Sequence, residues 1–209
     1  MSYTVEEIVN TSPVVPVIVV DKIEQAAPLA QALYNGGLKV LEITLRTPVA
    51  LEAMKAMKAA VPEAIVGAGT IVSPKDVNAA VEAGADFLVS PGTTDEMLDA
   101  VQAAGIPMLP GVSTPSDAMR LKARGFSVLK FFPAEAAGGT NMLKSIGGPL
   151  GDLRFCPTGG INLTRAPEYL ALPNVVCVGG TWMIPKDLIE AGDWQGIETL
   201  AREAASLSR

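Results

Sequence analysis

The strongest constraint on the fold of this chain is a regular alternation of short apolar segments with longer helix-like segments. The apolar segments are rich in Val, Ile, Leu and Phe, which is typical of strands buried on both faces of a parallel sheet. Eight strands are predicted on this basis, at residues 14–20, 39–45, 64–68, 87–89, 108–109, 128–132, 153–156 and 175–178. Strands that alternate with helices in this way favour an α/β fold built of parallel βα units.

The boundaries of the helices between these strands are marked by residues with known capping roles. A hydroxyl residue followed by proline is typical of a helix start, because the hydroxyl caps the helix and proline fits its first turn. This pattern occurs at Thr47-Pro48, Ser73-Pro74 and Thr114-Pro115. Glycine is typical of a helix end. We therefore expect helices to end at Gly36, Gly84, Gly105 and Gly125.

Two helical segments indicate which of their faces is buried. Met54 and Met57 are three residues apart, which fits the inner face of a helix, so both are predicted to lie in the core. Residues 193–208 are predicted to form a final amphipathic helix whose inward residues are Ile197, Leu200 and Ala204.

Length and composition bear on the number of domains. The chain has 209 residues, 49% of them hydrophobic, which is enough for one sizeable core. No linker or change of composition divides the sequence. Eight βα units in a chain of this length predict a single-domain (β/α)8 TIM barrel over residues 1–209.

The composition also excludes several classes of function. The sequence contains no histidine, which removes Ser-His-Asp and Cys-His catalysis and the commonest metal ligand. Its cysteines, Cys156 and Cys177, both lie in apolar strand-like stretches, where buried and unreactive thiols are expected. We expect no metal and no cofactor. A net charge of −6 without a basic run indicates that nucleic acid is not a partner.

The N-terminal residues bear on cellular location. The first ten residues are polar and acidic, which does not resemble a signal peptide. The apolar run at 14–20 is too short to span a bilayer. The sequence therefore predicts a cytoplasmic protein that has no membrane partner.

Lys130 is the first candidate for chemistry, because it lies in the apolar segment 128–132. A buried ammonium loses its hydration, and burial favours the neutral amine, which is a nucleophile toward carbonyl groups. Lys130 is thus a candidate for Schiff-base formation. The alternative is a strand-end lysine whose stem packs on phenylalanine while its ammonium reaches water.

The alternation of side chains along the predicted strands places further groups near Lys130. In the second strand, Glu42, Thr44 and Arg46 share one face, while Leu41, Ile43 and Leu45 share the face suited to helix packing. In the sixth strand, Val128, Lys130 and Phe132 share a face. Glu42 and Lys130 are therefore both predicted to face inward, with Arg46 nearer the rim.

This pair of charges has two interpretations. It could be a structural ion pair. The surplus positive charge of Arg46 favours a catalytic pair instead, because a guanidinium can bind a substrate carboxylate through two hydrogen bonds.

Two glycine pairs follow the last two predicted strands, as Thr158-Gly159-Gly160 and Gly179-Gly180-Thr181. In (β/α)8 barrels the loops at these positions frequently bind phosphate, because their backbone N–H groups point at the anion. The pairs therefore predict a phosphate site, to which Thr181 can add a hydroxyl. Glycine also serves tight turns, which is the alternative.

Two further loops are ambiguous. Gly67-Ala68-Gly69-Thr70 lacks the spacing of a dinucleotide-binding motif, and Thr70 either contacts a ligand or begins a turn. Pro91-Gly92-Thr93, after the fourth strand, leaves the same choice open.

Six strings stand out when the segments above are taken in order. They are Leu41-Glu42-Ile43-Thr44-Leu45-Arg46-Thr47, Gly67-Ala68-Gly69-Thr70, Val89-Ser90-Pro91-Gly92, Leu109-Pro110-Gly111-Val112, Lys130-Phe131-Phe132-Pro133-Ala134-Glu135 and Pro157-Thr158-Gly159-Gly160-Ile161. Together these strings resemble the 2-keto-3-deoxy-6-phosphogluconate (KDPG) and 4-hydroxy-2-oxoglutarate (KHG) aldolase family. The resemblance covers nearly the whole chain. It implies a metal-free class I aldolase of the Entner–Doudoroff pathway, usually a homotrimer, that cleaves KDPG to pyruvate and glyceraldehyde 3-phosphate and often acts on KHG.

The resemblance also implies a role for each matching residue. Lys130 would form the Schiff base and Glu42 would shuttle protons. The pyruvate part of the substrate would be held by Arg46, Thr70, Pro91 and Phe132. Thr158 would meet a substrate hydroxyl, and the phosphate would be bound by Gly159, Gly160, Gly180 and Thr181. Family members often carry serine at this last position, and Thr181 keeps the hydroxyl of that serine.

Three alternatives stay open at this point. An aldolase for non-phosphorylated KHG, or for the galactonate epimer of KDPG, would share Lys130, Glu42 and Arg46, so only the glycine pairs favour phosphate. A non-catalytic barrel that binds a sugar phosphate as a sensor or scaffold would use the inward charges structurally. A metal-dependent phosphosugar epimerase is disfavoured, because the metal ligands are missing.

Overall fold

The computed structural model describes residues 3–208, which form an α/β fold of alternating strands and helices. The elements are α1 (Val5–Asn10), β1 (Val14–Ile18), the 3-10 helix η1 (Ile23–Gln25), α2 (Ala26–Asn35), β2 (Val40–Thr44), α3 (Ala50–Ala60), β3 (Ile65–Gly69), α4 (Pro74–Glu82), β4 (Leu88–Val89), α5 (Asp95–Ala104), β5 (Met108–Leu109), β6 (Gly111–Val112), α6 (Pro115–Ala123), β7 (Val128–Phe131), α7 (Gly139–Gly147), β8 (Arg154–Pro157), α8 (Ala166–Leu170), β9 (Val178–Gly180), α9 (Lys186–Ala191) and α10 (Trp194–Ala205).

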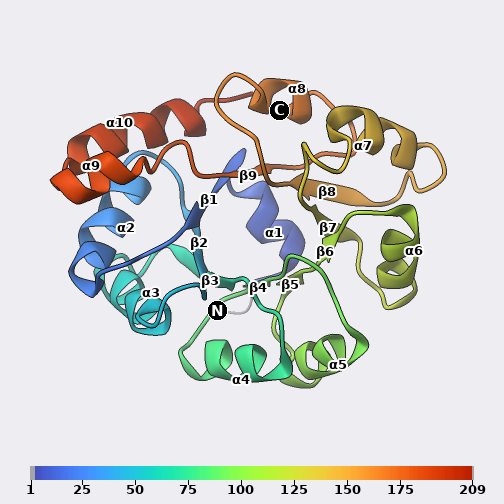
Figure 1. The fold of residues 1–209 in the computed structure, drawn as a ribbon, viewed down its shortest axis with the longest axis horizontal. Coiled ribbons are helices and arrows are strands. Elements are labelled where there is room, and N and C mark those ends of the chain that lie inside the picture. Colours follow the sequence, from blue (N-terminus) through green and yellow to red (C-terminus); the bar gives the residue numbers. More distant parts are fainter. Residues whose placement is uncertain (1–2, 209) are drawn as a thin grey trace.

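The strands form two parallel sheets that curl around a common interior. One sheet has the order β5-β4-β3-β2-β1-β9 and the other has the order β6-β7-β8. The sheets meet on one side at Pro110, which separates β5 from β6 and has no N–H to donate. On the other side, parallel bridges join Phe155 to Val175 and Thr158 to Gly179. The helices α2 to α10 surround the strands, and α1 lies inside the ring that they form (Figure 1).

Two apolar clusters cover the two faces of the strands. The larger one packs helices against the outward side chains of the strands, for example Leu41 and Ile43 of β2. The smaller, inner cluster consists of Ile8, Val9, Val15, Val40, Ile65, Phe87, Val89, Leu109, Val128, Cys156 and Cys177. Through Ile8 and Val9, α1 therefore closes the end of the interior where the strands begin.

The structure agrees with most of the predicted strands and corrects the last. Seven predicted segments match observed strands to within two residues at each end, although Pro110 leaves a short further strand, β6, after β5. The last strand was predicted at 175–178, but β9 spans Val178–Gly180. The apolar run ends too early to mark this strand. Its ladder with β1 instead runs through the two glycines that follow Val178, with Gly180 opposite Pro16.

Two of the three predicted helix starts are confirmed. Ser73 and Thr114 are the N-caps of α4 and α6, and each hydroxyl accepts a backbone N–H at 3.2 Å. Thr47 was wrongly predicted to be an N-cap, because α3 begins three residues later, at Ala50. The Thr47 hydroxyl donates instead to the Val20 carbonyl at 2.6 Å, which ties the loop after β2 to the loop after β1.

The helix ends and core faces follow the predictions closely. Gly36 and Gly105 are the C-caps of α2 and α5, and Gly84 and Gly125 each lie one residue past a C-cap. Met54 and Met57 are buried, as are Ile197 and Ala204 of α10, while Leu200 is half-buried against the outer cluster. The polar composition of the first ten residues did not predict α1. Within residues 3–208, none of the helices has the length and apolar character of a membrane span.

Candidate active site

Lys130 and Glu42 meet in the interior around which the two sheets curl. Lys130 lies on β7 and Glu42 on β2, which are not neighbours in either sheet, so the two side chains reach across the interior. The Lys130 Nζ donates to Glu42 Oε1 at 3.2 Å, and the two side chains are only 6% and 4% exposed. The structure thus brings together the pair that the side-chain alternation predicts. A buried ammonium needs such a partner, because it has lost its hydration.

The carboxylate of Glu42 depends on the glycine at position 69. A Cβ atom built on Gly69 would lie 2.3 Å from Glu42 Oε1, which is far closer than atoms can approach. Gly67, on the same strand, likewise leaves room for the Phe87 ring. A Cβ atom on Gly67 would lie 2.4 Å from the nearest atom of that ring. The glycines of β3 are therefore explained by close packing.

Phe132 lies beside Lys130 on the same side of the chain. The Lys130 Nζ is 5.6 Å from the centre of the Phe132 ring, within the range of a cation–π contact. The half-buried ring therefore forms a wall next to the amine. This contact also agrees with the alternative interpretation, in which the lysine packs against phenylalanine. The burial of its ammonium against Glu42, however, differs from a lysine that reaches water.

Arg46 and Thr70 meet at the rim, beyond the ends of β2 and β3. The Arg46 Nε donates to Thr70 Oγ1 at 3.1 Å, and Arg46 is exposed. Thr70 has a φ of 62°, the only positive value of a residue other than glycine among residues 3–208. A β-branched residue adopts this conformation at a cost of about 1–3 kcal/mol. Strain of this kind often marks a functional position, so this pair stays with the candidate site.

Pro91 follows β4 and packs against β6. A Cβ atom on Gly111 would lie 2.3 Å from the Pro91 carbonyl carbon, so glycine is needed there for the close approach of the two backbones. The buried Ser90 hydroxyl next to it accepts the Gly111 N–H at 3.2 Å. These contacts explain Pro91 by close packing, and its predicted contact with pyruvate stays a prediction.

The turn after β8 has a conformation that requires glycine. Gly159 and Gly160 have φ values of 108° and 77°. Thr158 is 6% exposed and packs directly on β9. A Cβ atom on Gly179 of that strand would lie only 2.3 Å from the Thr158 Oγ1, so glycine is needed there. The turn interpretation of this glycine pair therefore has direct support, and the predicted binding of phosphate to it stays a prediction.

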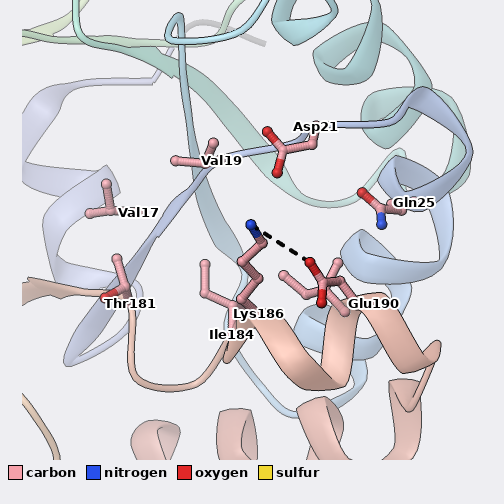
Figure 2. Close-up of a pocket in the computed structure, with 9 residues that line it drawn as sticks. Val17, Val19, Asp21, Gln25, Thr181, Ile184, Lys186 and Glu190 are labelled. Carbon is pink, nitrogen blue, oxygen red and sulfur yellow. Dashed lines mark ion pairs between the residues drawn. The ribbon is translucent and has the colours of Figure 1, made fainter.

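The loop after β9 borders a cavity of about 320 Å3. Its lining residues are Val17, Val19, Asp21, Gln25, Thr181, Ile184, Lys186, Ile189 and Glu190. Figure 2 shows the side chain of Lys186, the first residue of α9, extending toward Val19 and Asp21. Its ammonium pairs with Glu190 at 3.6 Å. The cavity is of the size that small-molecule sites have. Thr181 thus lies beside a hollow that contains both signs of charge.

Gly180, next to Thr181, is needed for the packing of Trp182. A Cβ atom on Gly180 would lie 1.9 Å from the Trp182 ring. The Trp182 Nε1 is buried and, within residues 3–208, has no hydrogen-bond partner. The second glycine pair therefore has a packing role, and its predicted phosphate contact stays a prediction.

Glu135 is a charged residue near the site for which the sequence analysis predicted no role. Its carboxylate accepts hydrogen bonds from Arg165 and from the Tyr169 hydroxyl. Glu135 ends the family-like string that begins at Lys130, and this position in the sequence could have indicated a role for it. In the described part of the chain, no group of three His, Cys, Asp or Glu side chains could hold a metal ion.

An inward lysine that faces a carboxylate inside an α/β fold is the arrangement that amine catalysis on carbonyl compounds requires. The family model for KDPG and KHG aldolase matches residues 5–200. The chain belongs to this aldolase family.

Named relatives agree over nearly the full length of the chain. A KHG/KDPG aldolase of Escherichia coli (strain K12) is 52% identical over 199 residues, covering 95% of this chain and 93% of the relative. A 2-dehydro-3-deoxy-phosphogluconate aldolase of Dickeya dadantii is 50% identical over 201 residues, covering 96% and 94%.

Solved structures of similar proteins have the same fold. A KDPG aldolase of Legionella pneumophila, with pyruvate captured at low pH as a covalent carbinolamine intermediate, is 47% identical with a TM-score of 0.93, covering 96% of this chain and 97% of that one. The KDPG aldolase of Zymomonas mobilis is 45% identical with a TM-score of 0.94, covering 99% and 98%.

Proposed function

We propose that this protein is a class I aldolase that cleaves KDPG to pyruvate and D-glyceraldehyde 3-phosphate, and that it also acts on KHG. The observation that carries the proposal is the buried contact of 3.2 Å between Lys130 Nζ and Glu42 Oε1. Family membership supports it, as do the names of relatives that are about half identical. The reaction needs an amine, a proton carrier and a site for a carboxylate, and each has a candidate here.

Lys130 would act as the nucleophile. The lone pair of its neutral amine forms a bond to the keto carbon of the substrate, and loss of water from the carbinolamine leaves a protonated imine. The bond between C3 and C4 then breaks, and its electron pair moves into the imine to form an enamine. The C4 hydroxyl loses its proton, and the aldehyde leaves. Protonation of the enamine at C3 and hydrolysis release pyruvate and restore the amine.

Glu42 would carry the protons of these steps. They occur one after another on the same substrate, so one carboxylate can serve all of them. Its contact with Lys130 places it within hydrogen-bond reach of the reacting nitrogen. The absence of histidine from the sequence is compatible with this scheme.

The pyruvate part of the substrate would lie between Lys130 and the rim. Arg46 and Thr70 would hold its carboxylate, supported by their mutual hydrogen bond and by the exposure of the guanidinium. Arg46 uses Nε in that bond, and an arginine has four further N–H donors for a carboxylate. Phe132, beside the amine, and Pro91 would line the pyruvate carbons.

The phosphate end would lie across the last two strands. Thr158 would meet a substrate hydroxyl, and the phosphate would be bound by the backbone and hydroxyl groups of Gly159, Gly160, Gly180 and Thr181. The parallel bridge between Thr158 and Gly179, which brings the two turns together, supports this assignment. The competing substrates are a non-phosphorylated 4-hydroxy-2-keto acid and the galactonate epimer, which need the same lysine and carboxylate.

Thr181→Val tests the phosphate assignment, because valine keeps the shape of threonine and removes the hydroxyl. We expect kcat/KM for KDPG to fall about tenfold, the effect of one hydrogen bond to a charged group. The value for KHG should change much less, so assays of both substrates are the measurement. An equal loss of kcat/KM on both substrates would refute the phosphate assignment.

Trapping with borohydride in the presence of pyruvate tests the proposed function itself. Reduction of the imine should leave a stable adduct, which peptide mass mapping locates on Lys130. Lys130→Met should lose the adduct and all aldol cleavage while it still folds, which circular dichroism would show. Retained cleavage in this variant would refute the Schiff-base role. A folded parent protein without any adduct would favour the non-catalytic sugar-phosphate-binding barrel.

We also propose the larger architecture that the sequence predicted. The two sheets together would form one closed (β/α)8 barrel and a single domain over residues 1–209, supported by the bridges on one side and the short gap at Pro110 on the other. The protein would be a cytoplasmic homotrimer, an expectation that rests on family resemblance. Light scattering of the purified protein would measure the oligomeric state.

A further inference from the structure

The loops that follow β7 and β8 are joined by their backbones. The Ala134 N–H donates to the Thr158 carbonyl at 2.8 Å, and the Glu135 N–H donates to the Gly159 carbonyl at 3.1 Å. One of these loops begins two residues after Lys130, and the other carries the turn proposed for the phosphate end. The relative position of amine and turn is therefore set where the loops meet.

The side chain of Glu135 lies directly over this turn. A Cβ atom on Gly160 would lie 2.6 Å from Glu135 Cγ and 2.9 Å from its Cβ. On Gly159, a Cβ atom would lie 3.3 Å from Pro133 Cα and 3.5 Å from the Phe132 ring. The turn is thus enclosed by residues 132–135, and a movement of Glu135 would be transmitted to the turn.

The carboxylate of Glu135 is held by α8 and its N-cap residue. Arg165, the N-cap residue of α8, donates to Oε2, and the Tyr169 hydroxyl donates to Oε1. Tyr169 is 1% exposed. Burial raises the pKa of Tyr169, against the nearby charge of Arg165, so its hydroxyl stays protonated and remains a donor. The carboxylate therefore links the loop after β7 to the helix that follows the turn.

We propose that Glu135 is a positioning residue which, held by Arg165 and Tyr169, sets the turn at Thr158–Gly160 relative to Lys130 and so controls binding of the phosphate end of the substrate. The proposal rests on the proposed function. Glu135 acts here through the turn and contacts no reacting atom. Because pyruvate has neither the hydroxyl nor the phosphate, its reaction with Lys130 does not depend on the turn.

The test uses Glu135→Gln and, as a second variant at a half-exposed position, Arg165→Gln. Both remove the ion pair, and glutamine at 135 keeps the size and an acceptor for Tyr169. Glu168→Gln is the matched control, because Glu168 is an exposed carboxylate on the same helix. We expect KM for KDPG to rise about tenfold in both variants, as expected for a lost charged hydrogen bond. The yield of borohydride-trapped pyruvate should stay at the parent level in both variants. In the Glu168→Gln control, both KM for KDPG and this yield should stay at the parent level.

Two results would overturn the proposal. The first is an unchanged KM for KDPG in both variants. The second is a loss of pyruvate trapping in proportion to the loss of KDPG cleavage, which would make Glu135 a residue of general stability only. A failure of the proposed function looks different, because the unmodified protein would then cleave no KDPG and trap no pyruvate.

Discussion

Gly69 decides how close Glu42 comes to Lys130, because it is the residue of β3 beside the carboxylate. Glycine has no side chain there, and a Cβ atom would lie 2.3 Å from Glu42 Oε1 and 2.7 Å from Glu42 Cγ. Since β2 and β3 are fixed by five pairs of residues, the backbone has little freedom to move away. The carboxylate would have to turn instead, away from the amine.

We therefore predict that Gly69→Ala lowers kcat/KM by about 100-fold, the effect of a displacement of about 1 Å in a catalytic group. Steady-state cleavage of KDPG and pyruvate trapping should both fall, because both need Glu42 beside Lys130. Gly148→Ala is the control, since a Cβ atom there makes only an ordinary contact, at 3.7 Å. Normal trapping in Gly69→Ala would contradict the proton-carrying role of Glu42.

Among the elements, α1 has a particular place because it closes the interior below Glu42. Val5, Ile8 and Val9 of this helix border a narrow cavity of about 10 Å3, which Glu42 and Cys156 also line. A space of this size is about that of one water molecule. The helix is short and is held by its capping box, in which Glu7 accepts the Thr4 N–H at 2.7 Å and donates its own N–H to the Thr4 hydroxyl. The Ser127 hydroxyl also donates to Glu6, at 2.7 Å.

The capping box of α1 should make stability depend on pH. The hydrogen bond from the Thr4 backbone, followed by that from its hydroxyl, holds the pKa of Glu7 below the ordinary value of 4.5. A lowered pKa in the folded state stabilises the fold above the unfolded value, and this contribution is lost as the pH falls through the folded value. We predict that Glu7→Gln lowers Tm at pH 7, and that the difference from the parent shrinks in acid well below pH 4.5.

Thermal unfolding followed by circular dichroism at the two pH values is the measurement. Glu63→Gln, in the exposed loop between α3 and β3, controls for the loss of one negative charge. A difference in Tm that is the same at both pH values would show that the carboxylate of Glu7 does not contribute through its charge.

At the scale of the whole molecule, α10 packs on α2, so the last helix of the chain is joined to an early one. Gly36, at the end of α2, makes this possible, because a Cβ atom there would lie 2.4 Å from Ala201 Cβ and 2.8 Å from the Glu198 carbonyl. The ladder between β1 and β9 joins the same two parts of the chain within the sheet. The segment that contains β1 and α2 and the segment that contains β9 and α10 are therefore expected to unfold together.

We predict that Gly36→Ala destabilises the protein by about 1–3 kcal/mol, the usual cost of an overpacked site. The loss should appear as a single transition, at the same denaturant concentration by circular dichroism and by residual activity. Gly148→Ala again serves as the control. Separate transitions by the two probes would contradict a single cooperative domain.

Much of the molecule could be predicted from local features of the sequence. The order of strands and helices, the caps at Ser73 and Thr114 and the inward direction of Glu42 and Lys130 follow from hydrophobic pattern, capping chemistry and the two-residue period of a strand. Glu42 and Lys130 are 88 residues apart, yet they meet because both strands alternate in the same sense around one interior.

Other features depend on which segments become neighbours, and only the tertiary structure decided them. The Thr47 hydroxyl donates to the Val20 carbonyl instead of capping a helix. The strand β9 begins at Val178, where its ladder with β1 begins, and it continues through Gly179 and Gly180. The space that Gly69 leaves for Glu42, and the contacts of Glu135 with Arg165 and Tyr169, likewise join distant parts of the chain. No local pattern of residues carries these contacts, because each is a property of two surfaces that the fold brings together.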